Sequence, residues 1–204
     1  MNFQSFFKCL AEKAPHPRVD VELLKQLVND HHPGVGKVQF RFFQDFDGAE
    51  IGNFIWLEEQ RTSAYEDPFN DAVVFINDRF ENNRPMRRII AAKELMHVFD
   101  APEERIGNRD SFKALLLEIE SNPVPTDASL AYAADRGALW KATLALVPPW
   151  IRDEFRAQWI DGSVKAPELA ARWWLPENVV TAAMGDYYDR MYDRFVVKGN
   201  LHTG

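Results

Sequence analysis

The stretch Arg87-Arg-Ile-Ile-Ala-Ala-Lys-Glu-Leu-Met-His-Val-Phe-Asp100 decides how this chain folds. It contains neither Gly nor Pro, and its apolar residues recur at spacings of three and four, which predicts a largely buried helix. On such a helix Lys93 and His97 lie over each other on one face, and Glu94 lies beside that face. An ammonium, a carboxylate and an imidazole are therefore expected to lie close together against the core.

The spacing of these three side chains is that of a metal-binding motif. In zinc peptidases, His-Glu-x-x-His places two imidazoles on the metal, and the Glu polarises the attacking water. In this chain the pattern is Lys93-Glu94-x-x-His97. A protonated lysine has three donors and no lone pair, so it cannot ligate zinc until it loses its proton. The motif is therefore one ligand short, and its chance occurrence on an ordinary core helix is the alternative interpretation.

Composition limits the class of protein. A chain of 204 residues is long enough for one well-buried domain with a helical appendage, and 46% hydrophobic residues exclude disorder as its overall description. The net charge of −7 argues against a broad nucleic-acid or anionic-membrane surface, although Arg79, Arg84, Arg87 and Arg88 could form a local basic patch. We expect neither nucleic acid nor a membrane as a partner.

The single cysteine and the hydropathy pattern bear on the compartment. Cys9 alone excludes an internal disulfide and any multi-cysteine zinc site. The N-terminus lacks the continuous apolar run of a signal peptide, and no stretch is apolar enough to span a bilayer. We therefore expect a soluble protein of the cytoplasm.

The residues before the central helix predict two helices and a small sheet. Apolar faces at helical spacing predict helices at residues 2–13 and 19–30. Aromatic and β-branched runs at residues 38–43 and 50–57 flank a turn and predict a hairpin. The run at residues 72–77 is nearly continuous in apolar character, which predicts a third strand inside the sheet.

The residues after the central helix predict helices only. Caps and breakers predict one helix from Asp110 or Ser111 to Glu120, a longer Ala-rich helix at 127–147 and three more at 150–161, 167–174 and 177–197. The expected fold class is α+β, in which a small antiparallel sheet packs on the helices at 86–99 and 127–147. The expected domains are an N-terminal arm or docking helix (1–18), an α+β domain (19–148) and a C-terminal helical subdomain packed on it (149–204).

Two signatures carry a resemblance to a known family. The third strand ends in Ile76-Asn77, the central helix opens with an Arg-rich turn, and Ala-Lys93-Glu-Leu-Met-His97 then stands where the family has Ala-His-Glu-Leu-Gly-His. The second signature runs from Asp135 through Ala138 and Ala142 to a Leu-Val-Pro stop. In this order the elements resemble the ImmA/IrrE family of zinc metallopeptidases over roughly residues 19 to 175.

The resemblance implies a zincin-like helix pair and a role for each site residue. Glu94 is the equivalent of the catalytic base, and His97 and Asp135 occupy two of the three ligand positions. Lys93 replaces the family's first His, and Asp135 replaces its Glu. With so few ligands left, we expect these ligand positions to be vestigial, Glu94 to be inactive and no cofactor to bind, with zinc the cofactor if the site does function.

Three functions follow from this reasoning. The preferred one is a metal-free pseudo-peptidase that binds a protein or peptide partner, possibly a helix-turn-helix regulator such as the repressors that the family's active members cleave. The first alternative is an active zinc-dependent endopeptidase that cleaves such a repressor. Its replacement ligand would come from a more distant histidine: His16, His31, His32 or His202. The second alternative is a DNA-binding regulator acting through residues 167–197, although residues 165–204 balance five basic against five acidic side chains.

A last expectation concerns the lysine itself. Without a metal, Glu94 and Asp135 would leave unpaired carboxylates in a partly buried pocket, which is unfavourable. We expect the Lys93 ammonium to fill the place of the zinc ion and to pair with Asp135. The alternative is that Lys93 extends to solvent and pairs with nothing.

Overall fold

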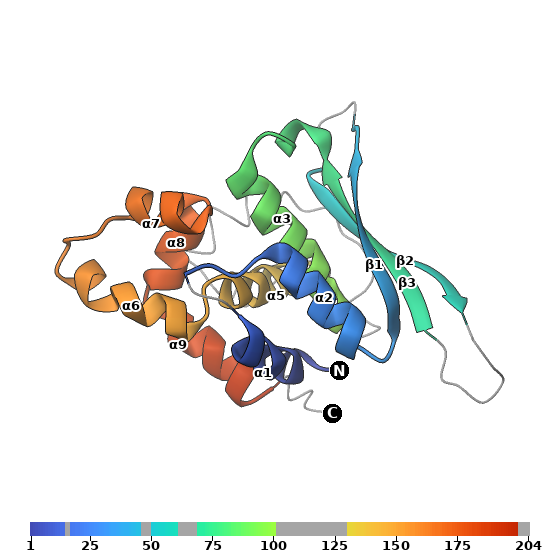
Figure 1. The fold of residues 1–204 in the computed structure, drawn as a ribbon, viewed down its shortest axis with the longest axis horizontal. Coiled ribbons are helices and arrows are strands. Elements are labelled where there is room, and N and C mark those ends of the chain that lie inside the picture. Colours follow the sequence, from blue (N-terminus) through green and yellow to red (C-terminus); the bar gives the residue numbers. More distant parts are fainter. Residues whose placement is uncertain (15–16, 46–49, 61–68, 101–129, 200–204) are drawn as a thin grey trace.

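The computed structural model describes residues 1–14, 17–45, 50–60, 69–100 and 130–199. These residues form an α+β fold in which a three-stranded sheet lies at one side of a group of helices (Figure 1). The strands are β1 (Val35–Phe43), β2 (Gly52–Gln60) and β3 (Phe69–Asn77). The α-helices are α1 (Phe3–Lys13), α2 (Val21–His31), α3 (Arg84–Met96), α5 (Leu130–Leu146), α6 (Pro149–Ile160), α7 (Ala166–Trp173), α8 (Glu177–Met184) and α9 (Tyr187–Tyr192).

Shorter helical segments complete the description. Asp78–Phe80 and His97–Phe99 are 3-10 turns before and after α3, and Asp193–Val197 is a π-helical segment that follows α9. The helix predicted from Asp110 or Ser111 to Glu120 and the start of the helix predicted at 127–147 lie outside the described residues.

The α+β class is confirmed, but the predicted hairpin is wrong. The strand order is β1-β3-β2, so β3 separates β1 from β2, with β1 parallel and β2 antiparallel to it. The sheet is therefore mixed and not antiparallel. The physical reason is burial: Val73 and Val74 point to opposite faces of β3 and both are buried, so the most apolar strand takes the central place.

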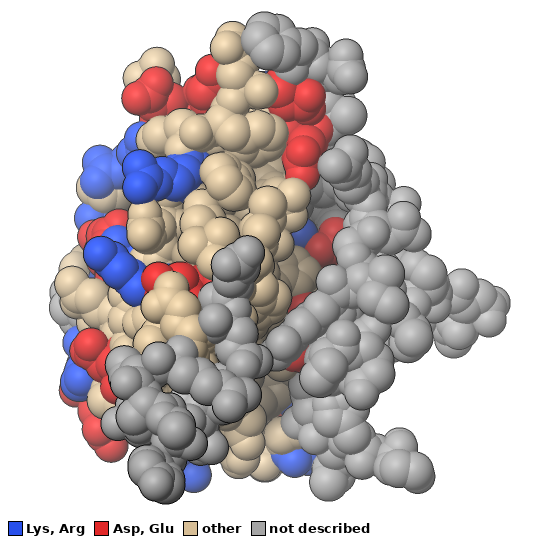
Figure 2. Space-filling view, turned by 90° about the vertical axis from the view of Figure 1, so that its right-hand side faces the viewer, with Lys and Arg blue, Asp and Glu red and all other residues tan. Residues whose placement is uncertain are grey.

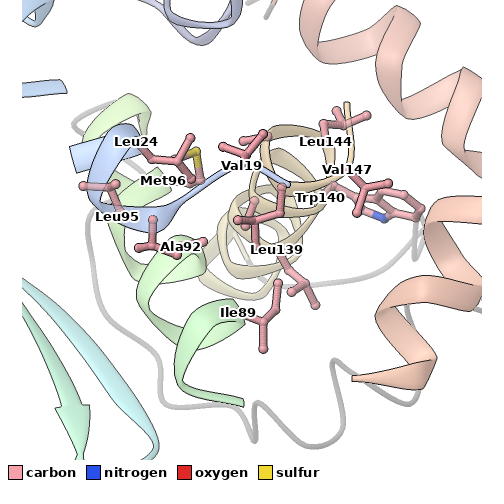
Figure 3. Close-up of a cluster of buried hydrophobic side chains, with 14 of the residues drawn as sticks. Val19, Leu24, Ile89, Ala92, Leu95, Met96, Leu139, Trp140, Leu144 and Val147 are labelled. Carbon is pink, nitrogen blue, oxygen red and sulfur yellow. The ribbon is translucent and has the colours of Figure 1, made fainter. Parts of the chain in front are cut away.

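Helix α3 lies at the centre of the fold, between the sheet and α5 (Figure 1). Its side chains Ile89, Ala92 and Met96 are fully buried, and Figure 3 shows Ile89 near Leu139 of α5 in the same cluster of buried side chains. Small residues of α5, among them Ala138 and Ala142, are also fully buried, which lets the two helices approach closely. The predicted packing of the sheet against the helix at 86–99 is confirmed, and α5 packs on the far side of that helix.

The N-terminal helix belongs to the same core. In α1, Phe6 and Leu10 are fully buried, and the ring of Phe7 lies 5.7 Å from that of Trp150, between centroids. Phe3 lies 5.6 Å from Phe99 in the same measure. One continuous hydrophobic core therefore includes side chains from all three segments expected as domains.

The predicted helix at 177–197 is divided in the structure. It ends at Met184, because Gly185 takes an extended conformation with ψ of 173°, and the chain turns before α9 begins. A side chain at Gly185 would bring a Cβ within 3.1 Å of the Thr181 carbonyl oxygen, which is a tight contact. In the part of the chain described here, no helix combines the length and apolarity needed to cross a bilayer.

Candidate functional site

Helices α3 and α5 and the turn after α3 place the candidate site residues. The Asn83 side chain caps α3 by accepting a hydrogen bond from the Met86 amide, and Pro85 occupies the first turn, so the helix begins three residues earlier than the quoted stretch. It ends at Met96, and His97 is the C-cap residue from which the 3-10 turn starts. Lys93 and His97 still lie on the face that packs toward Asp135 of α5.

Lys93 forms the expected ion pair. Its ammonium lies 2.5 Å from Asp135 Oδ1 and 3.1 Å from Glu94 Oε1, and the residue is only 5% exposed. Burial disfavours the charged form, but the charges of Glu94 and Asp135 and the hydrogen bonds to them outweigh it and raise the pKa of Lys93 above its ordinary value. The pairing with Asp135 is confirmed, and the alternative of a lysine extended to solvent is wrong.

His97 lies between two carboxylates. Its Nδ1 is 2.5 Å from Asp100 Oδ2 and its Nε2 is 3.1 Å from Asp135 Oδ1, while Glu94 Oε2 is 3.7 Å from Nε2. Burial and the Lys93 charge favour the neutral ring, but the hydrogen bonds to Asp100 and Asp135 outweigh them and raise the pKa of His97 to about 9. The ring is therefore an imidazolium near neutral pH, and both nitrogens donate.

Sequence reasoning missed two members of this cluster. Asp100 is buried and accepts a hydrogen bond from Lys141 Nζ at 3.0 Å, and Lys141 is itself only 2% exposed. Burial opposes ionisation of Asp100, but the hydrogen bond and charge of His97 and the charge of Lys141 lower its pKa below the ordinary value. The available signal was a lysine on the buried, Ala-rich face of α5, because a lysine there needs an acidic partner.

The six side chains form a charge-balanced cluster, which we call the ionic cluster. Its cations are Lys93, His97 and Lys141, and its anions are Glu94, Asp100 and Asp135. Three positive charges thus meet three negative charges, so that this buried network as a whole carries no net charge. The arrangement satisfies the rule that buried charges are paired.

The donor set of the ionic cluster does not fit a zinc ion. Zinc needs a neutral imidazole with a lone pair and carboxylate oxygens that are free to coordinate. Here both nitrogens of His97 face carboxylates, and Asp135 Oδ1 accepts from Lys93 as well as from His97. Within the described ranges, no three His, Cys, Asp or Glu side chains are arranged to hold a metal ion.

The histidines considered as replacement ligands lie elsewhere or outside the description. His31 Nε2 is 3.3 Å from the Lys13 ammonium, and the ring of His32 lies 5.8 Å from that of Phe99, between centroids. His16 and His202 lie outside the described residues. The structure therefore brings together Lys93, Glu94, His97 and Asp135, and it brings neither His31 nor His32 to them.

Strand β2 covers one side of the ionic cluster. A Cβ added to Gly52 would lie 2.6 Å from Ile90 Cγ2 and 3.1 Å from Glu94 Oε1, so the absence of a side chain lets α3 approach the strand. The ring of Phe54 lies 6.3 Å from that of His97, between centroids. The side chains of His97 and Asp135 keep 16% and 14% of their surface exposed, so the cluster reaches the surface beside this strand.

The segment considered for DNA binding is largely occupied by packing. In α8, Val179, Val180, Ala182, Ala183 and Met184 are buried, and so are Leu169 and Trp173 of α7. A recognition helix must expose the face that enters the groove. The burial of α8 supports a packing role for this helix pair.

Comparison of the chain with family models, with curated proteins and with solved structures gives no match.

Proposed function

We propose that this chain is a metal-free pseudo-peptidase of the ImmA/IrrE type, acting in the cytoplasm as a module that binds a protein or peptide partner. Two sequence signatures in the family's order support this descent, and the packing of α3 on α5 is what the resemblance requires of a zincin-like helix pair. The proximity of His97 to Asp135, at 3.1 Å, is likewise the geometry that two former ligand positions would have.

The observation that carries the proposal is the position of the Lys93 ammonium. It lies within hydrogen-bonding distance of both Glu94 and Asp135, the residues that would serve as base and ligand in an active relative. A fixed cation there supplies the positive charge that these carboxylates need, without a Lewis acid and without an activated water. In this function the ionic cluster stabilises the fold, and the neighbouring surface binds the partner.

Strand β2 is the proposed place for the partner. Within the described part of the sheet it pairs with β3 alone, and an extended peptide can add to a free strand edge through main-chain hydrogen bonds. Ile55 and Leu57 of β2 are each 41% exposed. Figure 2, which views the molecule from the side of the sheet, shows a broad area without charged side chains. By analogy with the family, the partner would be a peptide segment of a helix-turn-helix regulator.

The test of the proposal begins with metal content. Wild-type protein and Lys93→His, both purified without added zinc, are analysed for metal and titrated with zinc in the presence and absence of a chelator. We expect the wild type to bind no stoichiometric zinc, and Lys93→His to gain zinc binding because the substitution restores the missing imidazole. Equimolar zinc in the wild type, or chelator-sensitive cleavage of a helix-turn-helix repressor that Glu94→Gln abolishes, would favour the active endopeptidase instead.

Partner binding is tested at β2. Peptides selected from a displayed library on the wild type should lose binding to Leu57→Lys and keep binding to Lys8→Glu, an exposed change on α1. Selected peptides that bind both variants equally would refute the proposed position of the partner.

A further inference from the structure

A second site is formed away from the ionic cluster, where the N-terminal ends of α2 and α3 meet strand β1. A cavity of about 300 Å³ opens there, and four arginines line it: Arg41, Arg84, Arg87 and Arg88. This volume is at the lower end of the range of small-molecule sites, roughly 300 to 1,000 Å³. The chain as a whole has a net charge of −7, whereas the four arginines make the lining of this cavity positively charged.

Among the described residues, carboxylates neutralise only part of the positive charge of this cavity. None of the four arginines forms an ion pair with a carboxylate among the described residues. The acidic residues in the lining are Asp20, which caps α2 by accepting from the Glu22 amide, and Glu22, which pairs with Lys25. Four arginines against two carboxylates leave an excess of two positive charges in the lining.

Arg88 has a buried hydrogen-bond donor that no described residue uses. The residue is 7% exposed, its Nη2 donates to the Val19 carbonyl oxygen at 2.8 Å, and its Nε has no hydrogen-bond acceptor among the described residues. Burial, together with the charge of Arg18, lowers the pKa of Arg88 to about 10, and the Asp20 charge only partly opposes this. A buried guanidinium with an unused donor is costly unless an acceptor is supplied from outside.

A neighbouring tryptophan holds one of the arginines in place. The guanidinium carbons of Arg84 and Arg18 lie 3.1 Å and 3.2 Å from the centroid of the Trp174 ring, so the two groups occupy opposite faces of the indole. Trp174 itself has a positive φ of 54°, a conformation that L residues seldom adopt, and it ends α7. Stacking uses the face of the Arg84 guanidinium and leaves its N–H edge free for an anion.

We infer that this cavity binds the phosphate of a small phosphomonoester that has an apolar body. A dianionic phosphate matches the excess of two positive charges, and guanidinium groups match phosphate oxygens in pairs of hydrogen bonds. Phe40, Ile76 and Ala91 supply an apolar part of the lining that inorganic phosphate would leave unused.

The experiment uses the full chain and four probes: phenyl phosphate, inorganic phosphate, benzoate and a peptide containing phosphoserine. Binding is followed by calorimetry and by the NMR signal of the arginine Nε–H groups. We expect phenyl phosphate to bind more tightly than the other three and to shift the Arg88 Nε–H signal. The double variant Arg84→Gln/Arg87→Gln should bind it about a hundredfold more weakly, because a hydrogen bond to a charged group is worth roughly tenfold or more in affinity.

Arg190→Gln, an exposed change on α9, is the matched control and should bind as the wild type does. Arg84 is exposed and Arg87 partly exposed, so the double variant is expected to fold, which its thermal unfolding verifies. Tighter binding of benzoate would indicate a carboxylate site and overturn the inference, and tighter binding of the phosphopeptide would assign the site to a protein partner. Equal binding by the double variant and the control, or no saturable binding of phenyl phosphate, would also overturn it.

Discussion

Replacing Lys93 by methionine isolates the electrostatic contribution of the ionic cluster. Methionine keeps most of the side-chain length and volume, so the substitution removes the charge and leaves only a small cavity. The side chains that remain are Glu94, 5% exposed, and Asp135, 14% exposed, which are too buried for water to replace the ammonium fully. Removing one partner of a buried ion pair costs about 3 kcal/mol or more, and we expect Lys93→Met to lose about that free energy of unfolding.

The assay is urea unfolding followed by tryptophan fluorescence at pH 7. With a urea dependence of about 2 kcal/mol per molar, the midpoint of Lys93→Met should fall by about 1.5 M. The matched control is Lys8→Met, because Lys8 is exposed on α1. In a double-mutant cycle with Asp135→Asn, the two changes should show a coupling of about 1 to 3 kcal/mol, since the side chains are in contact.

The pH dependence gives an independent check. The hydrogen bond from His97 and the charge of Lys93 overcome the effect of burial and hold the pKa of Asp135 below its ordinary value. Asp135 thus contributes stability that is present above its unfolded pKa and lost as the pH falls through the folded one. The deficit of Lys93→Met relative to the wild type should be largest near pH 7 and shrink toward pH 4. A midpoint no lower than that of Lys8→Met, or a coupling near zero, would refute the role given to Lys93.

Three further outcomes are expected. Because the folded pKa of His97 is raised from 6.5 to about 9, its contribution is complete below pH 6.5 and is lost as the pH rises through 9, by roughly 3 kcal/mol. Chemical unfolding at pH 6 and pH 9.5 measures this loss, which should be absent in His97→Gln. Gly52→Ala should destabilise by about 1 to 3 kcal/mol, because its Cβ would lie 2.6 Å from Ile90 Cγ2. A fall in the melting temperature of Gly52→Ala no larger than that of an exposed substitution would contradict this prediction. Arg152→Met should cost about 3 kcal/mol, because its buried guanidinium donates to the Ala183 carbonyl oxygen at 2.9 Å and to Asp189 at 2.8 Å. Calorimetry measures this loss. An unchanged free energy of unfolding in Arg152→Met would show that these hydrogen bonds make no net contribution to stability.

The helices were the part of the fold that sequence predicted best. The helix predicted at residues 19–30 is present as α2, which Asp20 caps, and the apolar spacing around Lys93 predicted the helix that the structure describes as α3. Both depend on residues a few positions apart, whose effects are local. The helix predicted at 177–197 is interrupted at Gly185, where the backbone becomes extended.

The sheet order and the composition of the ionic cluster depend on contacts between residues that are far apart in the sequence. The hairpin prediction assumed that strands adjacent in sequence pair, whereas β3 takes the central place because both its faces are buried. The pairing of Lys93 with Asp135 could be predicted, because a resemblance placed both on one pair of helices. Asp100 and Lys141 could not, since they are 41 positions apart and no short motif joins them.

The sequence by itself determined the α+β class, the central helix and the spacing of Lys93, Glu94 and His97 along it, because hydrophobic periodicity and caps act over a few residues. Only the tertiary structure decided that Asp100 and Lys141 join these charges. A buried charge must find its partner in space, and the partners of Lys93 and His97 come from α5 and from the turn after α3. The same holds for the arginine-lined cavity, whose walls come from α2, α3 and β1 and whose Arg84 is held by Trp174, 90 residues further along the chain.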